Sequence, residues 1–397
     1  MPQTERYVAL DAMRGFVMLV LCSAGFGLGY LNKNPNYRSL AQHFHHLDWE
    51  CMVAWELIMP TFMFIVGASL PFALKRREWE GAGFAGKFRH VGLRALKLIL
   101  LGQILTTLHK GRYGYEPYET LTQLGLSCFC AFLILELRPR WQPVAAALFL
   151  VANWLLYQLF PGAAGPFSPN DNIGVVIDQE VFNLDHTGSW ATLNFLGSSI
   201  TVLFGSWTTL LLLSQRSQRE KIGILVAAAA VSLALGLLLN PILPVIHKAW
   251  TISFTFWHTG CVLTGVTLFF WLFDCLGFHR AAFPLVVVGL NSIFIYLVHE
   301  TLDGWTSRWL RSLEDSSSWE ASLRPCRRAR LSRSCGTPAT GSINAGFSSR
   351  CSGAELFKFP LCPANFLVAR SASERRVPLL PPGPRHLWHR NVLIDQS

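Results

Sequence analysis

Long apolar runs alternate along the chain with short clusters of charged residues and glycine. A helix needs about 20 predominantly apolar residues to cross a bilayer, and helices satisfy their own backbone polar groups in lipid. The pattern predicts an all-α fold, a polytopic transmembrane helical bundle with nine spans. The expected spans are residues 13–31, 52–74, 91–109, 119–136, 142–160, 191–213, 222–246, 250–274 and 281–299.

Composition supports this class. Of the 397 residues, 51% are hydrophobic and only 15% are charged, whereas soluble domains have about 25% charged residues. The formal net charge is +10, but no nucleic-acid-binding motif accompanies it. We therefore expect the lipid bilayer as the partner and no nucleic acid. The sequence is also compatible with a homo-oligomer.

The distribution of positive charges predicts the orientation, because Lys and Arg collect in cytoplasmic loops. With the N-terminus in the cytoplasm, the inner segments hold Arg6, Arg14, Lys75, Arg76, Arg77, Lys87, Arg89, Arg94, Lys97, Arg138, Arg140, Arg216, Arg219, Lys221 and Arg280. The outer segments then hold only Lys33, Arg38, Lys110, Arg112 and Lys248. We therefore expect an integral protein of the cytoplasmic (inner) membrane with its N-terminus in the cytoplasm.

The C-terminal part differs in composition from the rest. Residues 1–312 form the predicted transmembrane domain, and residues 313–397 are rich in Arg, Ser and Pro. From Asp315 onward the chain has eleven Arg and one Lys against five acidic residues. This part is either a disordered tail or the product of a shifted reading frame that replaced a tenth span. Resequencing the gene would distinguish the two.

Two ionisable residues stand at the inner end of the first apolar run. Asp11 and Arg14 are three residues apart and share a helix face. They form either a local ion pair that starts the helix, with Asp11 favouring its N-terminal dipole, or a charge pair that holds an anionic cofactor. Within the last expected span, Asn291 can hydrogen-bond across helices.

A second polar set precedes the second apolar run. His43, His45 and His46 lie close together, but their spacing is not that of a zinc site, so no metal is expected. A histidine near Asp48 suits acid–base chemistry, because imidazole titrates near neutrality. Glu56 enters the span, where an ionisable side chain is a functional candidate.

Further polar residues lie in later segments. The loop 161–190 is acidic and contains Asp185; it is either a solvated cap or a lid over a substrate vestibule. His258 lies within a span and is either a neutral histidine bonded to a neighbouring helix or a functional group. His299 ends the last span on the predicted outer side.

Five motifs occur in one order: R-Y-x-A-L-D-A-M-R-G, W-x₆-E-L-I-x-P-x-F-x-F-I-V-G, T-Q-L-G-L, H-K-A-W-T and V-V-G-L-N-S-I-x-I-Y-L-V-H-E. In this order they resemble the heparan-alpha-glucosaminide N-acetyltransferase family and its bacterial relatives. The resemblance implies a multi-span membrane acyltransferase that moves an acetyl group from cytoplasmic acetyl-CoA, a co-substrate, to a saccharide amine or hydroxyl outside. It assigns His46 as the catalytic residue, in an H-x-x-W pattern ahead of Trp49.

The hypothesis of acyl transfer adds further candidates, chosen from their charge and position. Asp48 and Glu56 are expected to assist His46. Acetyl-CoA is expected to be bound by Asp11, Arg14, Arg94 and Asn291, and the acceptor by Asp185 and His299. The chain departs from the family pattern at Cys51, where Gly is usual, at Glu56, where Asp is usual, and at Gly25, the position nearest to an Asn of the lysosomal enzyme. A proton-coupled transporter or flippase, and a catalytically inactive membrane scaffold, remain the alternatives.

Overall fold

The structure, a computed structural model, describes residues 7–23, 25–28, 31, 35–46, 49–50, 53–110, 115–184 and 190–302. All of these residues lie in the first of the two units into which the chain divides, Met1–Pro338. The predicted tail from residue 313 and the hypothetical tenth span lie outside the described residues. The division at residue 312 therefore stays a prediction.

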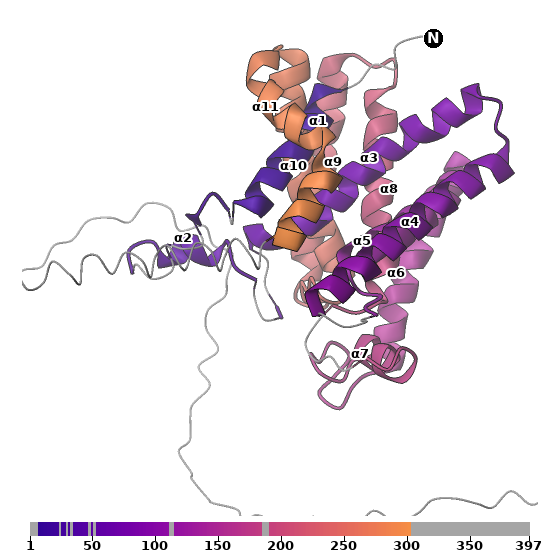
Figure 1. The fold of residues 1–397 in the computed structure, drawn as a ribbon, viewed down its shortest axis with the longest axis vertical. Coiled ribbons are helices and arrows are strands. Elements are labelled where there is room, and N and C mark those ends of the chain that lie inside the picture. Colours follow the sequence, from indigo (N-terminus) through magenta and orange to yellow (C-terminus); the bar gives the residue numbers. More distant parts are fainter. Residues whose placement is uncertain are drawn as a thin grey trace, which may run out of the picture. The chain divides into compact units, whose positions relative to one another are not determined.

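Within the described ranges the regular structure is helical, apart from two isolated β-bridges. Figure 1 shows helices from distant parts of the sequence packed side by side. The elements are α1 (Val8–Cys22), α2 (Arg38–Gln42), the 3₁₀ turn η2 (Ala54–Leu57), α3 (Ile58–Trp79), α4 (Phe84–Lys110), α5 (Thr120–Leu135), η3 (Pro139–Trp141), α6 (Gln142–Leu159), α7 (Ile173–Glu180), α8 (Asn194–Leu212), α9 (Gln218–Leu239), α10 (Ile252–Phe269), the π-helical η4 (Phe270–Cys275) and α11 (His279–Leu290).

Six of these helical segments are long and apolar enough to cross a membrane: Ala54–Trp79, Phe84–Lys110, Pro139–Leu159, Asn194–Leu212, Gln218–Leu239 and Ile252–Cys275. A seventh candidate is His279–Leu290 with Ser292–Leu302, which are bent by 64° at Asn291. The prediction of a multi-span membrane protein is confirmed, but nine spans are not reproduced among the described residues. The other two expected spans correspond to α1 and α5, which have 15 and 16 residues.

Helices α3 and α8 lie in the middle of the packed helices. In the apolar 18-residue stretch of each helix, 67% of the stretch is buried inside the protein, against 22% in α9. The two helices approach closely because each has a glycine at the crossing. A Cβ atom on Gly67 would overlap the backbone of Val202, and one on Gly205 would overlap the backbone of Phe64. This close approach at Gly67 and Gly205 holds α3 against α8.

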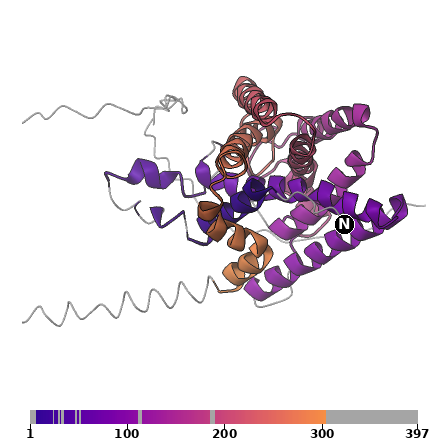
Figure 2. The same ribbon diagram turned by 90° about the horizontal axis from the view of Figure 1, so that it is seen from above.

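Helix α1 lies between α3 and the C-terminal helices. It packs most extensively against α11, and both views of the ribbon show these two helices adjacent (Figures 1 and 2). The Asp274 carboxylate in η4 accepts the backbone N–H groups of Val8 (3.0 Å) and Ala9 (2.9 Å). These are among the amide groups that a helix start leaves without intrahelical partners, so Asp274 fixes the start of α1.

Candidate functional site

The chain reaches the site through a loop that folds back on the start of the α3 segment. The backbone N–H of Trp55 in η2 donates to the His43 carbonyl at 2.9 Å. This contact places the loop that carries His46 next to the turn that carries Glu56. The site therefore forms where α2, η2 and the first turn of α3 meet.

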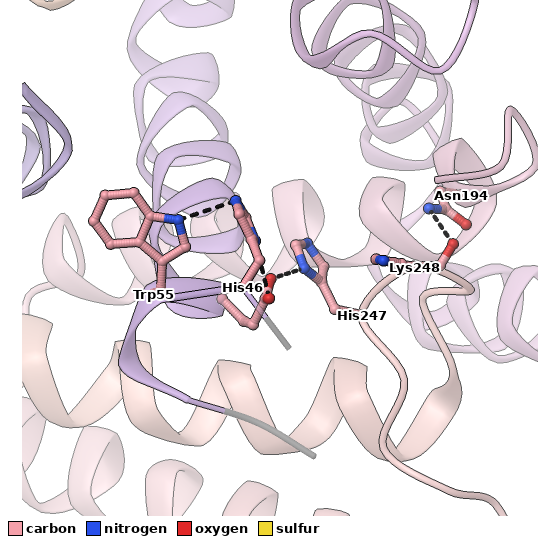
Figure 3. Close-up of polar contacts among 6 residues, drawn as sticks. His46, Trp55, Asn194, His247 and Lys248 are labelled. Atoms are coloured by element: carbon pink, nitrogen blue, oxygen red, sulfur yellow. Dashed lines mark hydrogen bonds and ion pairs between the residues drawn. The ribbon is translucent and has the colours of Figure 1, made fainter. Parts of the chain in front are cut away.

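Glu56 lies between His46 and His247, both labelled in Figure 3. Its Oε1 atom is 3.0 Å from Nδ1 of His46, and its Oε2 atom contacts Nδ1 of His247. Glu56 and His247 are 3% and 5% exposed, whereas the His46 side chain is 51% exposed. One carboxylate thus joins an accessible imidazole to a buried one.

The hydrogen bond from Trp55 defines the tautomer of His46. The indole Nε1–H of Trp55 lies 3.0 Å from Nε2 of His46, and an indole nitrogen only donates. Nε2 of His46 therefore accepts, and the ring proton is on Nδ1, where it is donated to Glu56. This is the form in which a histidine presents a lone pair at Nε2 and is oriented by a carboxylate at Nδ1, as in the Ser-His-Asp triad.

The loop between α9 and α10 brings His247 to this carboxylate. An antiparallel bridge joins Glu50 to Ile246, directly beside His247. Thr251, the N-cap of α10, accepts the Ile246 N–H at 3.2 Å and donates to the Pro244 carbonyl at 2.9 Å. On the other side, the Asn194 side chain donates to the Lys248 carbonyl at 2.9 Å (Figure 3). The loop is thus attached at several points on each side of His247.

His46 and His247 line a cavity of about 180 Å³, together with Met18, Leu21, Trp55, Ile58, Met59, Phe62, Thr120, Trp190, Tyr296 and Glu300. A neighbouring cavity of about 270 Å³ shares Met59, Thr120, Trp190, Tyr296 and Glu300 with it, and it adds polar residues such as Glu116 and Lys110. In this second cavity, Tyr118 donates to Glu116 at 3.0 Å. Burial, reinforced by the charge of Glu116, raises the pKa of Tyr118, so its phenol stays protonated near neutral pH.

A third cavity, of about 370 Å³, lies further along α1 and α3. It is lined by Tyr7, Leu10, Asp11, Arg14, Ile65, Ala68, Ser69, Phe72, Ala73 and Arg76. The expected pair is present: Arg14 Nη1 is 3.6 Å from Asp11 Oδ1. Arginine side chains suit phosphate and carboxylate groups, so this cavity can hold an anionic ligand.

The first and third cavities are lined by successive turns of the same two helices. On α3, the residues at the His46 cavity end with Phe62, and those at the Arg14 cavity begin with Ile65. Three residues correspond to about 4.5 Å along a helix. Similarly, Arg14 and Met18 on α1 face different cavities but are one turn apart. The two cavities therefore lie at successive turns of the α1 and α3 helices.

The other predicted site residues lie as follows. Asp48 and Asp185 lie outside the described residues. Arg94 is half-buried on α4 and does not belong to the third cavity. Asn291 is exposed at the bend after α11, where its side chain donates to the Val287 carbonyl at 2.9 Å. His299 is half-buried, but its neighbour Glu300 lines the first two cavities.

His258 has the structural contacts that one of its two interpretations predicted. It is fully buried on α10, and its Nε2 atom is 2.9 Å from the Thr201 hydroxyl on α8. Sequence reasoning placed Glu300 only at the outer end of the last span, and it did not single out His247 or Trp190. His247 and Glu300 lie inside motifs used for the resemblance, H-K-A-W-T and the run that ends in V-H-E. Their position in these motifs was the signal by which they could have been found.

These residues group an accessible histidine, a buried carboxylate and an arginine-lined cavity along one pair of helices. Residues 6–171 match the family described as heparan-alpha-glucosaminide N-acetyltransferase, catalytic. The resemblance is confirmed over this segment, which includes His46, Glu56, Asp11 and Arg14. No curated protein matches the chain. The protein thus has a heparan-alpha-glucosaminide N-acetyltransferase-like catalytic domain within a multi-span membrane protein.

The structure shows what surrounds two of the positions at which the chain departs from the family pattern, Glu56 and Gly25. At position 56 the carboxylate is retained on a side chain one methylene longer than Asp, and it contacts His46. At position 25 the backbone has φ 66°, and a Cβ atom there would overlap the Phe44 ring. A side chain at position 25, Asn included, would therefore not fit without a shift of the Phe44 ring.

Proposed function

We propose that this protein is a membrane acetyltransferase that takes an acetyl group from acetyl-CoA on one side of the membrane and passes it to an amine or hydroxyl of a saccharide on the other. The observation that supports this most strongly is the α1–α3 interface, which has an arginine-lined cavity at one end and His46 at the other. A reaction between a cytoplasmic donor and an external acceptor needs such a pair of sites. The family match of residues 6–171 supports the same reaction class.

Acetyl-CoA is proposed to bind with its phosphates near Arg14 and its pantetheine arm along the α1–α3 interface. The N-terminus would face the cytoplasm, in line with the positive charges around the α3–α4 connection. Figure 1 shows this connection at the opposite end of the packed helices from α7. The acceptor would approach through the two adjoining cavities that share Tyr296 and Glu300.

His46 is proposed to act through Nε2 in one of two ways. As a general base, it takes the proton of the acceptor amine or hydroxyl while the acceptor attacks the thioester carbonyl, and the CoA thiolate leaves. As a nucleophile, it forms an acetyl-imidazole with release of the thiolate, and the acceptor then takes the acetyl group. In both cases the Nδ1–H bond to Glu56 stabilises the positive charge that develops on the ring.

The deciding experiment uses the purified full chain in detergent. Acetyl-CoA should raise its melting temperature, because a ligand that binds the folded state stabilises it by mass action, and labelled acetyl groups should pass to an amino sugar or a hydroxyl-bearing glycan. Absence of both effects would exclude the proposal. Solute uptake that depends on the proton gradient but not on acetyl-CoA would instead indicate a transporter.

A further inference from the structure

The second hydrogen bond of the Glu56 carboxylate has no part in the proposed reaction. Oε1 of Glu56 lies 3.0 Å from His46, and Oε2 is engaged by Nδ1 of His247. His247 comes from the loop between α9 and α10, 191 residues away in the sequence. It lies outside the segment that matches the catalytic family.

The direction of a glutamate carboxylate has to be imposed by its partners. The terminal torsion of Glu is broad and nearly two-fold, so one hydrogen bond leaves the carboxylate plane free to turn. A second donor on the other oxygen fixes that plane. The His247 ring can do this because it is itself held: it stacks on Phe254 at 5.0 Å and meets Trp190 edge-on at 5.7 Å.

We propose that His247 is a positioning residue that acts through Glu56 on His46. Its Nδ1–H holds the carboxylate so that Oε1 stays directed at Nδ1 of His46, which keeps the Nε2 lone pair of His46 on the cavity side. This inference rests on the proposed function of His46.

The Nε2 atom of His247, on the other edge of its ring, allows the positioning role to be tested against a direct catalytic role. Nε2 of His247 is buried and has no hydrogen-bond partner among the described residues. If that atom reacted with substrate, the ring would be a second catalytic group. Two amide substitutions distinguish the roles of the two ring nitrogens. The amide nitrogen of Asn takes the place of Nδ1, and the amide nitrogen of Gln takes the place of Nε2.

The experiment compares His247→Asn and His247→Gln in the purified full chain. We expect His247→Asn to keep most of the turnover. We expect His247→Gln to lower kcat by about tenfold or more, because a misplaced catalytic group reacts more slowly, with an unchanged KM for acetyl-CoA. Retention by the Gln variant with loss in the Asn variant would overturn the proposal in favour of Nε2. Equal loss in both would overturn it as well.

His258→Asn is the matched control. His258 is fully buried in the same aromatic cluster, 4.7 Å from the Phe254 ring, but its ring nitrogen faces Thr201 and not Glu56. The control should change the melting temperature without changing kcat or the reactivity of His46.

A second readout does not depend on acetyl transfer. Diethyl pyrocarbonate acylates accessible imidazoles, and the exposed His43 serves as an internal reference. The rate ratio of His46 to His43 should fall in His247→Gln and stay constant in His247→Asn and His258→Asn. If the wild-type protein transferred no acetyl group, the proposed function would be contradicted, but the positioning role of His247 would not. An unchanged ratio in His247→Gln of an active protein would contradict the positioning role alone.

Discussion

The indole of Trp55 donates a hydrogen bond to Nε2 of His46 at 3.0 Å, and so occupies the atom that the proposed reaction uses. In this structure the lone pair is therefore masked by a protein group. An acceptor or a thioester carbonyl has to displace the indole before Nε2 can react. The contact also keeps the His46 ring turned toward the cavity.

Replacement of Trp55 by Phe should unmask His46. Phe keeps an aromatic ring but lacks the indole N–H donor. A net hydrogen bond contributes about 0.5–1.5 kcal/mol, which corresponds to a rate change of about two- to tenfold. We expect faster acylation of His46 by diethyl pyrocarbonate, measured by peptide mass spectrometry. Trp79→Phe, at the exposed far end of α3, is the control and should leave the rate unchanged. A slower reaction in Trp55→Phe would show that the indole activates His46.

Glu56→Gln should impair both activity and stability. The carboxylate accepts from two imidazole N–H groups, whereas an amide has only one acceptor oxygen and would place its NH₂ against one of these donors. We expect acetyl transfer to fall by about a hundredfold or more, and the free energy of unfolding to fall by about 1–3 kcal/mol. Initial rates and thermal unfolding in detergent give the two numbers.

Glu50→Gln is the control for that substitution. Glu50 is exposed and contacts Ile246 through its backbone, so its carboxylate is not needed for the bridge. Its variant should resemble wild type in both measurements. If Glu56→Gln also retained wild-type transfer, Glu56 would have no role in orienting His46.

The sequence allowed part of the site to be predicted because some of its signals are local. Glu56 was identifiable as an ionisable residue in an apolar run, and His46 by its H-x-x-W context. The contact of Glu56 with His247 spans 191 residues, so no periodicity or spacing contains it. It follows from the way the α9–α10 loop meets the segment around Glu50.

The number of spans shows a different limit of prediction from the sequence, which concerns where helices end. An apolar run indicates that a segment is buried in lipid or protein, but it does not define where the helix ends. The run predicted as 13–31 contains a helix that ends at Cys22, because Gly25 and Phe26 adopt positive φ angles of 66° and 56°. Backbone reversals of this kind interrupt a helix without changing the mean hydropathy of the segment.

Arg14→Gln should weaken acetyl-CoA binding without affecting chemistry. Arg14 lines the third cavity beside Asp11, and a hydrogen bond to a charged group contributes about 1.5–3 kcal/mol. We expect the Kd for acetyl-CoA, measured by calorimetry, to rise by about ten- to a hundredfold, with kcat at saturation unchanged.

The ligand itself offers a control for Arg14. S-acetylpantetheine lacks the nucleotide phosphates, so wild type and Arg14→Gln should use it equally well. Arg140→Gln, an exposed arginine over the Trp141 ring, should bind acetyl-CoA as wild type does. An Arg14→Gln protein with unaltered affinity would remove the third cavity from the proposed donor site.

Gly205→Ala should loosen the crossing that holds α3 in place. A Cβ atom at Gly205 would overlap the Phe64 carbonyl, and relief of such overpacking typically costs about 1–3 kcal/mol. Gly223→Ala is the matched control, because it lies within α9 and a Cβ atom there meets nothing within 4 Å. It should be neutral or stabilise by up to about 1 kcal/mol, since Ala favours a helix over Gly. The same substitution is therefore expected to lower the melting temperature at Gly205 and not at Gly223. Equal shifts would mean that helix propensity, and not the contact between α3 and α8, dominates at both positions.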